Sequence, residues 1–400
     1  MLRLRNIIIV LGLFITAWIG WHINGYFFDT DLPSIKLTGI EENGYYAGDV
    51  QCLVSGNHHY KIADISIFLD SKLIVNKFRI NKRNFTYQFP LSTKSLSDGH
   101  HILEVTVTDG TRQRHTKSEI INFETDNTAL QARFISPEQN FKISQGHTFH
   151  VQFQTNKEIK NAKISIFAQQ FTCNPETQNS LIYECFIPIA CEETPNEYPF
   201  SIEIEDHVGN RQRLDGKLQI IPFPFKTRII NVKSEKMVQE KEIGKPQDIF
   251  EEELKKAVNA SPKTKLWTGL FIVPAQYSHF SCPFGEVRTT QEKGRYIHNG
   301  LDVIALPKSV VWAPQEGKVV LKDRFAFTGN TVIIDHGLGV FSLLFHLDNF
   351  ADIKVGDIVK KGNPVGTVGK TGYATGYHLH WEMRIHNIPV DPLQWTRTDF

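Results

Sequence analysis

The chain has almost no net charge and few cysteines. Its 400 residues include 44 Lys and Arg against 43 Asp and Glu, for a formal net charge of +1. Such a balance gives no sign of nucleic-acid binding. No cysteine lies near the N-terminus, since the first of the five is Cys52, so a lipoprotein anchor is not supported.

The positions of the five cysteines give little information about metal, redox or disulfide sites. Cys52 and Cys282 lie far apart and lack the CxxC spacing of a zinc or redox site, so we expect buried thiols. Cys173, Cys185 and Cys191 are close in sequence, and an exported domain could join two of them. Our choice among the pairings is Cys173 to Cys185, across a hairpin.

Charge is missing altogether from residues 7–28, a run long and apolar enough to span a membrane. Trp18 and Trp21 suit the membrane interface, and Arg3 and Arg5 precede the run. No small-x-small cleavage pattern follows it, which favours an uncleaved signal anchor over a removed signal peptide. We therefore expect the N-terminus in the cytoplasm and the rest of the chain in the periplasm or extracytoplasmic space.

An internal repeat with a period near one hundred residues follows the apolar run. Residues 65–68, Ile-Ser-Ile-Phe, recur at 164–167, and Arg-Gln-Arg at 112–114 recurs at 211–213. Both copies contain strictly alternating segments, as half-buried strands require. We interpret residues 29–125 and 126–225 as two tandem immunoglobulin-like β-sandwiches. Their role is either a spacer, which we favour, or a module that binds the wall or a partner.

The connector at 226–265 is rich in lysine and glutamate, and only residues 248–258 look ordered. Phe250, Leu254, Ala257 and Val258 fall on one helical face, and Asp248 with Glu251 has the spacing of a capping box. We expect a short helix that packs against a neighbouring domain. A plug over a groove is the alternative.

Two histidine motifs suggest a metal site. His298 and Asp302 flank Gly300, which suits a turn better than a helix interior. His378 and His380 follow about eighty residues later, and residues i and i+2 of a strand project from one face. Zinc in catalytic sites takes three protein ligands and keeps one position for water. An isolated pair of histidines would be weak evidence, so the surrounding sequence decides.

The surrounding segment, Leu266 to Trp395, carries a long series of ordered motifs. They are Phe271–Pro274, Ser281–Gly285, His298–Val303, Ala313–Val320, Gly329–Gly337, Phe345–Leu347, Val355–Lys360, Gly366–Gly372 and Gly376–Glu382. In this order they closely resemble the lysostaphin/LytM-type zinc endopeptidases, which cut the peptide part of bacterial cell wall. The resemblance covers about a third of the chain.

The resemblance implies that His298, Asp302 and His380 bind one Zn²⁺ and that His346 and His378 are the two catalytic imidazoles. Which of the two is the general base stays open. It also suggests that Asn330 contacts substrate, with a turn-forming asparagine as the alternative. Leu344–Phe345 stands where the family usually has a tyrosine before the histidine, which puts any role of that phenol in doubt. We expect no active role for His279, His336 or His386, and a structural role for Glu382.

Together these observations predict a mainly β chain. Its expected parts are a transmembrane helix at 1–28, the two β-sandwiches at 29–125 and 126–225, the linker at 226–265 and an antiparallel-β LytM-type peptidase domain at 266–400. The expected activity is a membrane-anchored zinc endopeptidase that hydrolyses cross-links or stems of peptidoglycan. The alternatives are a non-hydrolytic regulator of cell-wall amidases, as in family members that lost metal ligands, and a protease of protein substrates. Peptidoglycan and the membrane are the expected partners, and no protein partner can be identified from the sequence.

Overall fold

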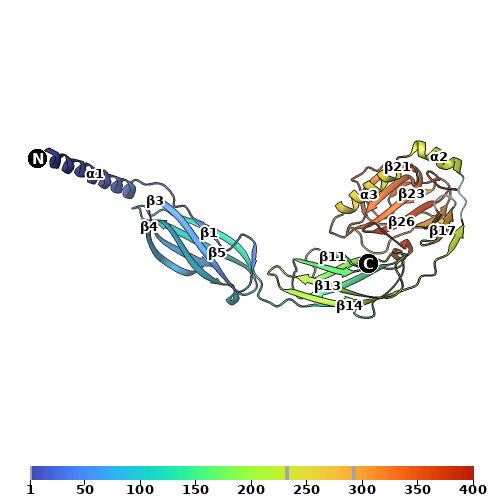
Figure 1. Ribbon diagram of the computed structural model, residues 1–400, viewed down its shortest axis with the longest axis horizontal. Coiled ribbons are helices and arrows are strands. Elements are labelled where there is room, and N and C mark those ends of the chain that lie inside the picture. Colours follow the sequence, from blue (N-terminus) through green and yellow to red (C-terminus); the bar gives the residue numbers. More distant parts are fainter. Residues whose placement is uncertain (1, 230–233, 291–293) are drawn as a thin grey trace. The chain divides into compact units, whose positions relative to one another are not determined.

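The computed structural model describes residues 2–229, 234–290 and 294–400. Residues 230–233 of the predicted linker and 291–293 of the predicted peptidase domain lie outside this part. The chain is mainly β, as predicted, and divides into two compact units (Figure 1). One unit holds residues 1–129 with 207–210, and the other holds 130–206 with 211–400. The predicted domain boundaries stay predictions.

The first unit begins with helix α1, Leu2–Phe27. Its segment Ile7–Phe27 is long and apolar enough to cross a membrane, and large side chains such as Leu13 and Phe14 are exposed along it. An apolar helix thus occupies the position predicted for the signal anchor.

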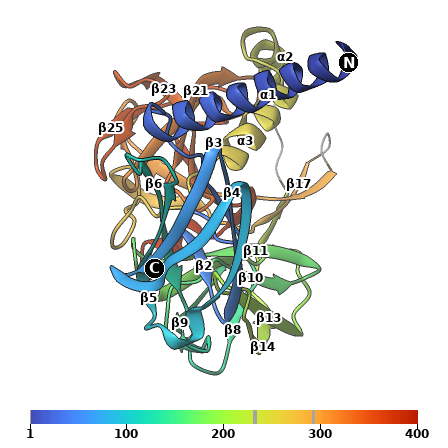
Figure 2. The same cartoon turned by 90° about the vertical axis from the view of Figure 1, so that its left-hand side faces the viewer.

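A sheet of six strands follows, with the order β1-β3-β5-β6-β2 and with β4 paired to β3. The long strands β3 and β4 lie side by side as a hairpin (Figure 2). Alternating residues Leu103, Val105 and Val107 are fully buried, as the sequence pattern predicted. The elements are β1 Lys36–Thr38, β2 Gly44–Tyr46, β3 Asp49–Leu69, β4 Lys72–Ser92, the 3-10 helix η1 Thr93–Ser95, β5 Gly99–Asp109 and β6 Thr116–Thr125.

The second unit begins with an eight-stranded sheet in the order β7-β9-β12-β11-β10-β13-β14-β8. The strands are β7 Ala132–Ser136, β8 Lys142–Ser144, β9 Thr148–Thr155, β10 Asn161–Ile166, β11 Gln169–Pro175, β12 Ile182–Pro188, β13 Glu197–Glu205 and β14 Arg211–Ile221. Both predicted repeats are therefore built of strands, while their immunoglobulin-like topology stays a prediction.

The cysteines differ from the expected pairing. Cys173 and Cys185 lie on the adjacent strands β11 and β12, beside the paired residues Asn174 and Glu184. All five cysteines are nevertheless buried free thiols, so the proposed Cys173–Cys185 disulfide is not formed. Burial raises the pKa of the Cys185 thiol well above its usual value.

The connector contains more helix than predicted. Helix α2, Ser234–Ile243, was not expected, and α3 runs over Gln247–Ala260. The capping-box prediction is wrong, because Pro246 is the N-cap residue and Asp248 accepts only from the N–H of Ile249. The predicted apolar face is correct at Phe250 and Leu254, which are buried on α3.

The rest of the second unit forms a ten-stranded sheet whose main path is β16-β19-β26-β23-β22-β21-β24. The strands are β16 Tyr277–Cys282, β19 Leu301–Ala305, β20 Val310–Trp312, β21 Gly317–Phe325, β22 Gly329–Asp335, β23 Val340–Phe350, β24 Ile358–Val359, β25 Pro364–Val368, β26 Leu379–Ile385 and β27 Ile388–Val390. Helix α4, Pro392–Trp395, is the last element of secondary structure. A small separate sheet joins β15 Thr227–Ile229, β17 Val287–Thr290 and β18 Gly294–Ile297.

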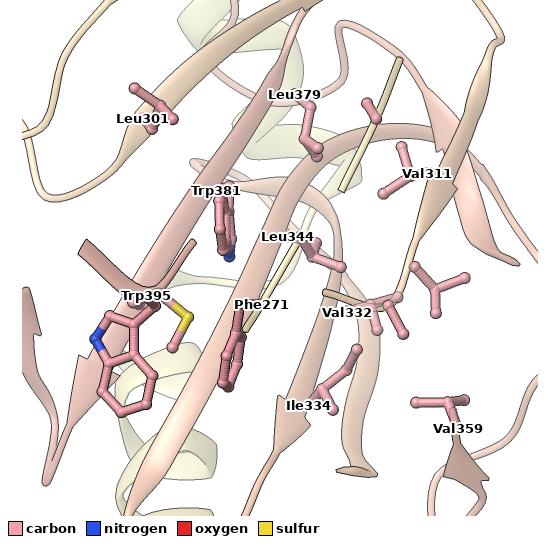
Figure 3. Close-up of a cluster of buried hydrophobic side chains, with 14 of the residues drawn as sticks. Phe271, Leu301, Val311, Val332, Ile334, Leu344, Val359, Leu379, Trp381 and Trp395 are labelled. Carbon is pink, nitrogen blue, oxygen red and sulfur yellow. The ribbon is translucent and has the colours of Figure 1, made fainter. Parts of the chain in front are cut away.

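The two faces of this sheet have different partners, because successive strand residues point to opposite sides. Leu344, Leu379 and Trp381 belong to the main core, shown in Figure 3. Phe345 belongs to a second cluster, where α3 covers β21, β22 and β23 through Phe250 and Leu254. His380 pairs with Phe345 across the strands and so lies on this second face.

Candidate metal centre

Strand pairing brings the three predicted metal ligands together. Asp302 of β19 lies opposite His380 of β26, and His298 precedes β19 by a short turn. Asp302 Oδ1 lies 3.0 Å from His298 Nε2 and 2.8 Å from His380 Nδ1, and the two ring nitrogens are 3.0 Å apart. Ligand atoms around a tetrahedral zinc with bonds of about 2.0 Å are about 3.3 Å from one another. The three atoms therefore have nearly the spacing that one ion needs.

Gly300 permits this convergence. A Cβ at position 300 would lie 2.6 Å from the Trp381 carbonyl oxygen and 2.7 Å from His380 Nε2. Any side chain there would push the turn away from β26. The glycine that the sequence suggested for a turn is thus also needed for close approach.

The ring orientations show which nitrogen atoms face the centre. His298 Nδ1 lies 3.0 Å from the Pro283 carbonyl oxygen, and His380 Nε2 lies 3.0 Å from Glu382 Oε1. Each of these nitrogens faces an acceptor and so carries hydrogen, which leaves His298 Nε2 and His380 Nδ1 with lone pairs directed at Asp302. Three electron-rich atoms within about 3 Å repel one another unless a cation, either a proton or a metal ion, lies among them. The donor set fits a divalent metal ion.

When a proton rather than a metal ion lies among the three ligand atoms, the pKa values indicate which residue carries it. Burial disfavours charge on His380, but the hydrogen bonds of Asp302 and Glu382 outweigh burial and raise its pKa to about 9. Burial also acts on Asp302, yet the charges and hydrogen bonds of His298 and His380 hold its pKa well below the usual value. The pKa of His298 is lowered by burial. A single proton on His380 therefore satisfies the cluster.

Three charged residues support the ligands from outside, and the sequence analysis identified only Glu382 among them. Glu382, expected to be structural, binds His380 with one oxygen and Arg384 with the other, the latter at 2.7 Å. Arg288 Nη2 donates to Asp302 Oδ2 at 2.7 Å, which leaves Oδ1 for the centre. Such partners fix the orientation of a metal ligand.

The two predicted catalytic histidines lie beside the three ligands. The rings of His346 and His378 are 4.9 Å apart, and His378 Nε2 is 3.6 Å from Asp302 Oδ1. His346 Nδ1 lies 2.8 Å from the Thr371 carbonyl oxygen and His378 Nδ1 lies 3.0 Å from that of Gly376. Both rings thus donate through Nδ1 and keep an Nε2 lone pair. Burial lowers the pKa of both, so both are neutral at neutral pH.

His346 has a left-handed backbone, with φ of 62°, which a non-glycine residue adopts at a cost of about 1–3 kcal/mol. Asn330 and Thr371 hold the chain after it. Asn330 Nδ2 donates to the carbonyls of Leu347 and Asp348, and Thr371 Oγ1 donates to that of Leu347. Thr371 belongs to the sequence motif Gly366–Gly372, but no role was predicted for it. The substrate contact of Asn330 stays a prediction, and its amide supports the loop.

The other histidines named in the sequence analysis lie outside this cluster. His336 is buried, with its nitrogens 2.7 Å from the Glu316 carbonyl oxygen and 2.8 Å from Ser342 Oγ. His279 is exposed on β16, and His386 lies at the turn after β26.

Cys282, which was expected to be only a buried thiol, lies beside the cluster. Its Sγ is within 4.8 Å of ligand atoms of both His298 and Asp302.

Comparison with known proteins identifies the region around this cluster. The family described as Peptidase family M23 matches residues 296–392. A DD-carboxypeptidase/endopeptidase of Neisseria meningitidis serogroup B is 37% identical over 125 residues, which are 31% of this chain and 29% of the relative. The peptidoglycan DD-endopeptidase ShyB of Vibrio cholerae is 32% identical over 123 residues, 30% of this chain and 29% of the relative. The chain thus matches less than a third of the length of these curated relatives.

A solved structure is also similar to part of the chain. The catalytic domain of lysostaphin from Staphylococcus simulans is 26% identical and covers 30% of this chain and 92% of its own, with a TM-score of 0.28. The family match and the named relatives agree with the resemblance found in the sequence. Residues 296–392 form a peptidase domain of family M23, the lysostaphin/LytM type.

Proposed function

We propose that this chain is a zinc endopeptidase that hydrolyses the peptide part of peptidoglycan and is held at the membrane by α1. The observation that carries the proposal is the convergence of His298 Nε2, Asp302 Oδ1 and His380 Nδ1 within 3.0 Å of one another. Relatives named as peptidoglycan DD-endopeptidases support the substrate class.

His298, Asp302 and His380 would hold one zinc ion. When bound, zinc supplies a Lewis acid that makes hydroxide available at neutral pH and polarises the scissile carbonyl. Arg288 and Glu382 keep the ligands oriented, because each binds the atom of a ligand that faces away from the centre.

His346 and His378 would transfer the protons of the reaction. Both present a neutral imidazole with an Nε2 lone pair, so either can accept a proton from water and return it to the leaving amine. After accepting the proton, the ring is a cation and can stabilise the oxyanion of the tetrahedral intermediate. The matching orientations support roles shared between the two rings.

The β repeats would hold the peptidase domain at a distance from the membrane. The apolar helix α1 supports membrane attachment, with the charged residues Arg3 and Arg5 of the sequence on the cytoplasmic side. The substrate would then be the wall layer outside the membrane.

The test uses purified soluble chain from about residue 30, isolated wall sacculi and a control. Wild-type chain and the exposed-histidine variant His279→Ala should bind zinc and release muropeptides whose peptide bonds are cut. His380→Ala should do neither. Zinc binding without release, combined with activation of an amidase, would replace the proposal with a regulator. Cleavage of protein substrates but not of sacculi would indicate a protease.

A further inference from the structure

A second set of metal-ligating side chains lies in the first unit, where the chain leaves α1. Asp29 follows the end of α1 at Phe27, and His58 and His59 lie in the middle of β3. One potential ligand atom from each of these three residues lies within 4.8 Å of the other two. We propose that Asp29, His58 and His59 bind a divalent transition-metal ion of the zinc class.

The distances fit such an ion. Asp29 Oδ2 lies 3.1 Å from His59 Nε2 and 3.5 Å from His58 Nε2. Ligands of a tetrahedral zinc are about 3.3 Å apart, and two imidazoles with one carboxylate form a common zinc donor set. The two imidazole rings stack with their centroids 5.1 Å apart, and one ligand atom of each lies within 4.8 Å of the other.

The buried carboxylate supplies an independent observation. The side chain of Asp29 is only 2% exposed, and its Oδ2 makes no hydrogen bond. The other oxygen, Oδ1, accepts from the N–H of Asp31. A buried carboxylate oxygen that lacks a hydrogen-bond donor is costly, and a cation at this position removes the cost.

The backbone of β3 explains why neighbouring histidines share one site. Adjacent residues of a regular strand point to opposite faces. Between Asn57 and Ile62, however, the pairing of β3 with β4 shifts register. The irregular stretch lets His58 and His59 both turn towards Asp29.

Binding would shift the ring hydrogen of His58 from one nitrogen to the other. His58 Nε2 lies 3.1 Å from the Asp31 carbonyl oxygen, and His58 Nδ1 accepts from the Tyr60 N–H at 3.3 Å. With an ion at Nε2, the ring hydrogen moves to Nδ1 and both of these bonds are given up. The loss of these two bonds is a cost that the ion must offset. Asp109 Oδ2, at 4.0 Å from His58 Nε2, adds negative charge that favours a cation.

The ion would act as a clasp between the segment after α1 and the β-sheet. Residue 29 would be tied to residues 58 and 59 of β3, next to the backbone hydrogen bond from Ser34 to Asn57. Metal binding of this kind contributes directly to folding free energy, because the ligands are apart in the unfolded chain. The clasp does not depend on the peptidase activity.

The test uses full-length chain in detergent with the peptidase centre removed by His298→Ala and His380→Ala. Zinc is added, excess is removed, and bound zinc is measured by mass spectrometry of the metal. We expect one equivalent of zinc to remain and to raise the Tm of the first unit. Adding His59→Gln or Asp29→Asn to this chain should weaken zinc binding by more than about 100-fold. Loss of a residue that only supports a metal ligand weakens binding by about 10–100-fold, so the larger loss identifies a ligand.

His100→Gln is the matched control, because His100 is an exposed histidine of the same unit whose Nδ1 lies 3.2 Å from Glu124 Oε1. His59 is 49% exposed, so its substitution should lower the Tm with zinc by much more than the Tm without zinc. Absence of zinc from the chain without the peptidase centre would overturn the proposal. Equal zinc binding by the His59→Gln and His100→Gln chains would also overturn it.

Discussion

The affinity of the peptidase centre for zinc should depend steeply on pH, because zinc must displace the proton held by His380. With no metal present, Asp302 and Glu382 raise the pKa of His380 to about 9 despite its burial. The raised pKa means that the protonated form is favoured below about pH 9. Zinc affinity should therefore fall as the pH falls through this value.

The size of the effect follows from the pKa values. At pH 7, displacing the proton from a group with a pKa of about 9 costs roughly 3 kcal/mol. Asp302 and His298 add no further proton near neutral pH, because the pKa of each is lowered. The apparent Kd should thus rise about tenfold for each unit of pH lost between about 9 and 7.

Chelator competition on metal-free protein measures this dependence, and calorimetry in buffers of different ionisation enthalpy counts the protons released. About one proton should leave per zinc at pH 7. Glu382→Gln removes one of the charges that raise the pKa of His380, so it should move the steep region to lower pH. A Kd that stays constant between pH 7 and 8.5, without proton release, would refute this reasoning.

Four further substitutions test the catalytic histidines, the packing of α3 and the turn at Gly300. His346→Ala and His378→Ala should keep zinc but lower turnover by about 10²–10⁴-fold, and full activity of either variant would remove that ring from the mechanism. Phe250→Ala should lower the free energy of unfolding by about 3–5 kcal/mol in urea, because the buried ring fills the space between α3 and the sheet, whereas exposed Lys255→Ala should not. Gly300→Ala should weaken zinc binding, measured by the same chelator competition, because its Cβ would collide with the neighbouring strand; unchanged affinity would show that the turn can shift freely.

The strands and the helical face of the fold followed from local patterns. The spacing of Phe250 and Leu254 predicted a buried helical face, and both side chains pack on the sheet. The start of α3 was less predictable, because Asp248 and Glu251 have capping-box spacing whereas the helix begins after Pro246. The predicted Cys173–Cys185 disulfide was also wrong. Nearness in sequence and on adjacent strands does not determine whether two thiols are oxidised.

The candidate ligands could be found from spacing, and so could the structural role of Glu382, two residues after His380 on the same strand. Arg288 could not be found, because it reaches Asp302 only where the chain folds back between the small sheet and β19. The contact of His298 Nδ1 with the Pro283 carbonyl oxygen likewise depends on the fold. Phe345 stacks on His380 with ring centroids 5.3 Å apart. Its apolar edge also contacts Phe250 of α3, which connects this helix to the metal centre.

His298, Asp302 and His380 are proposed to share one zinc ion. Anomalous X-ray scattering from crystals of the zinc-loaded protein, recorded at energies above and below the zinc absorption edge, would locate this ion. We predict an anomalous peak at about 2.0–2.2 Å from His298 Nε2, Asp302 Oδ1 and His380 Nδ1. Fully loaded crystals without a peak among these three atoms would contradict the account.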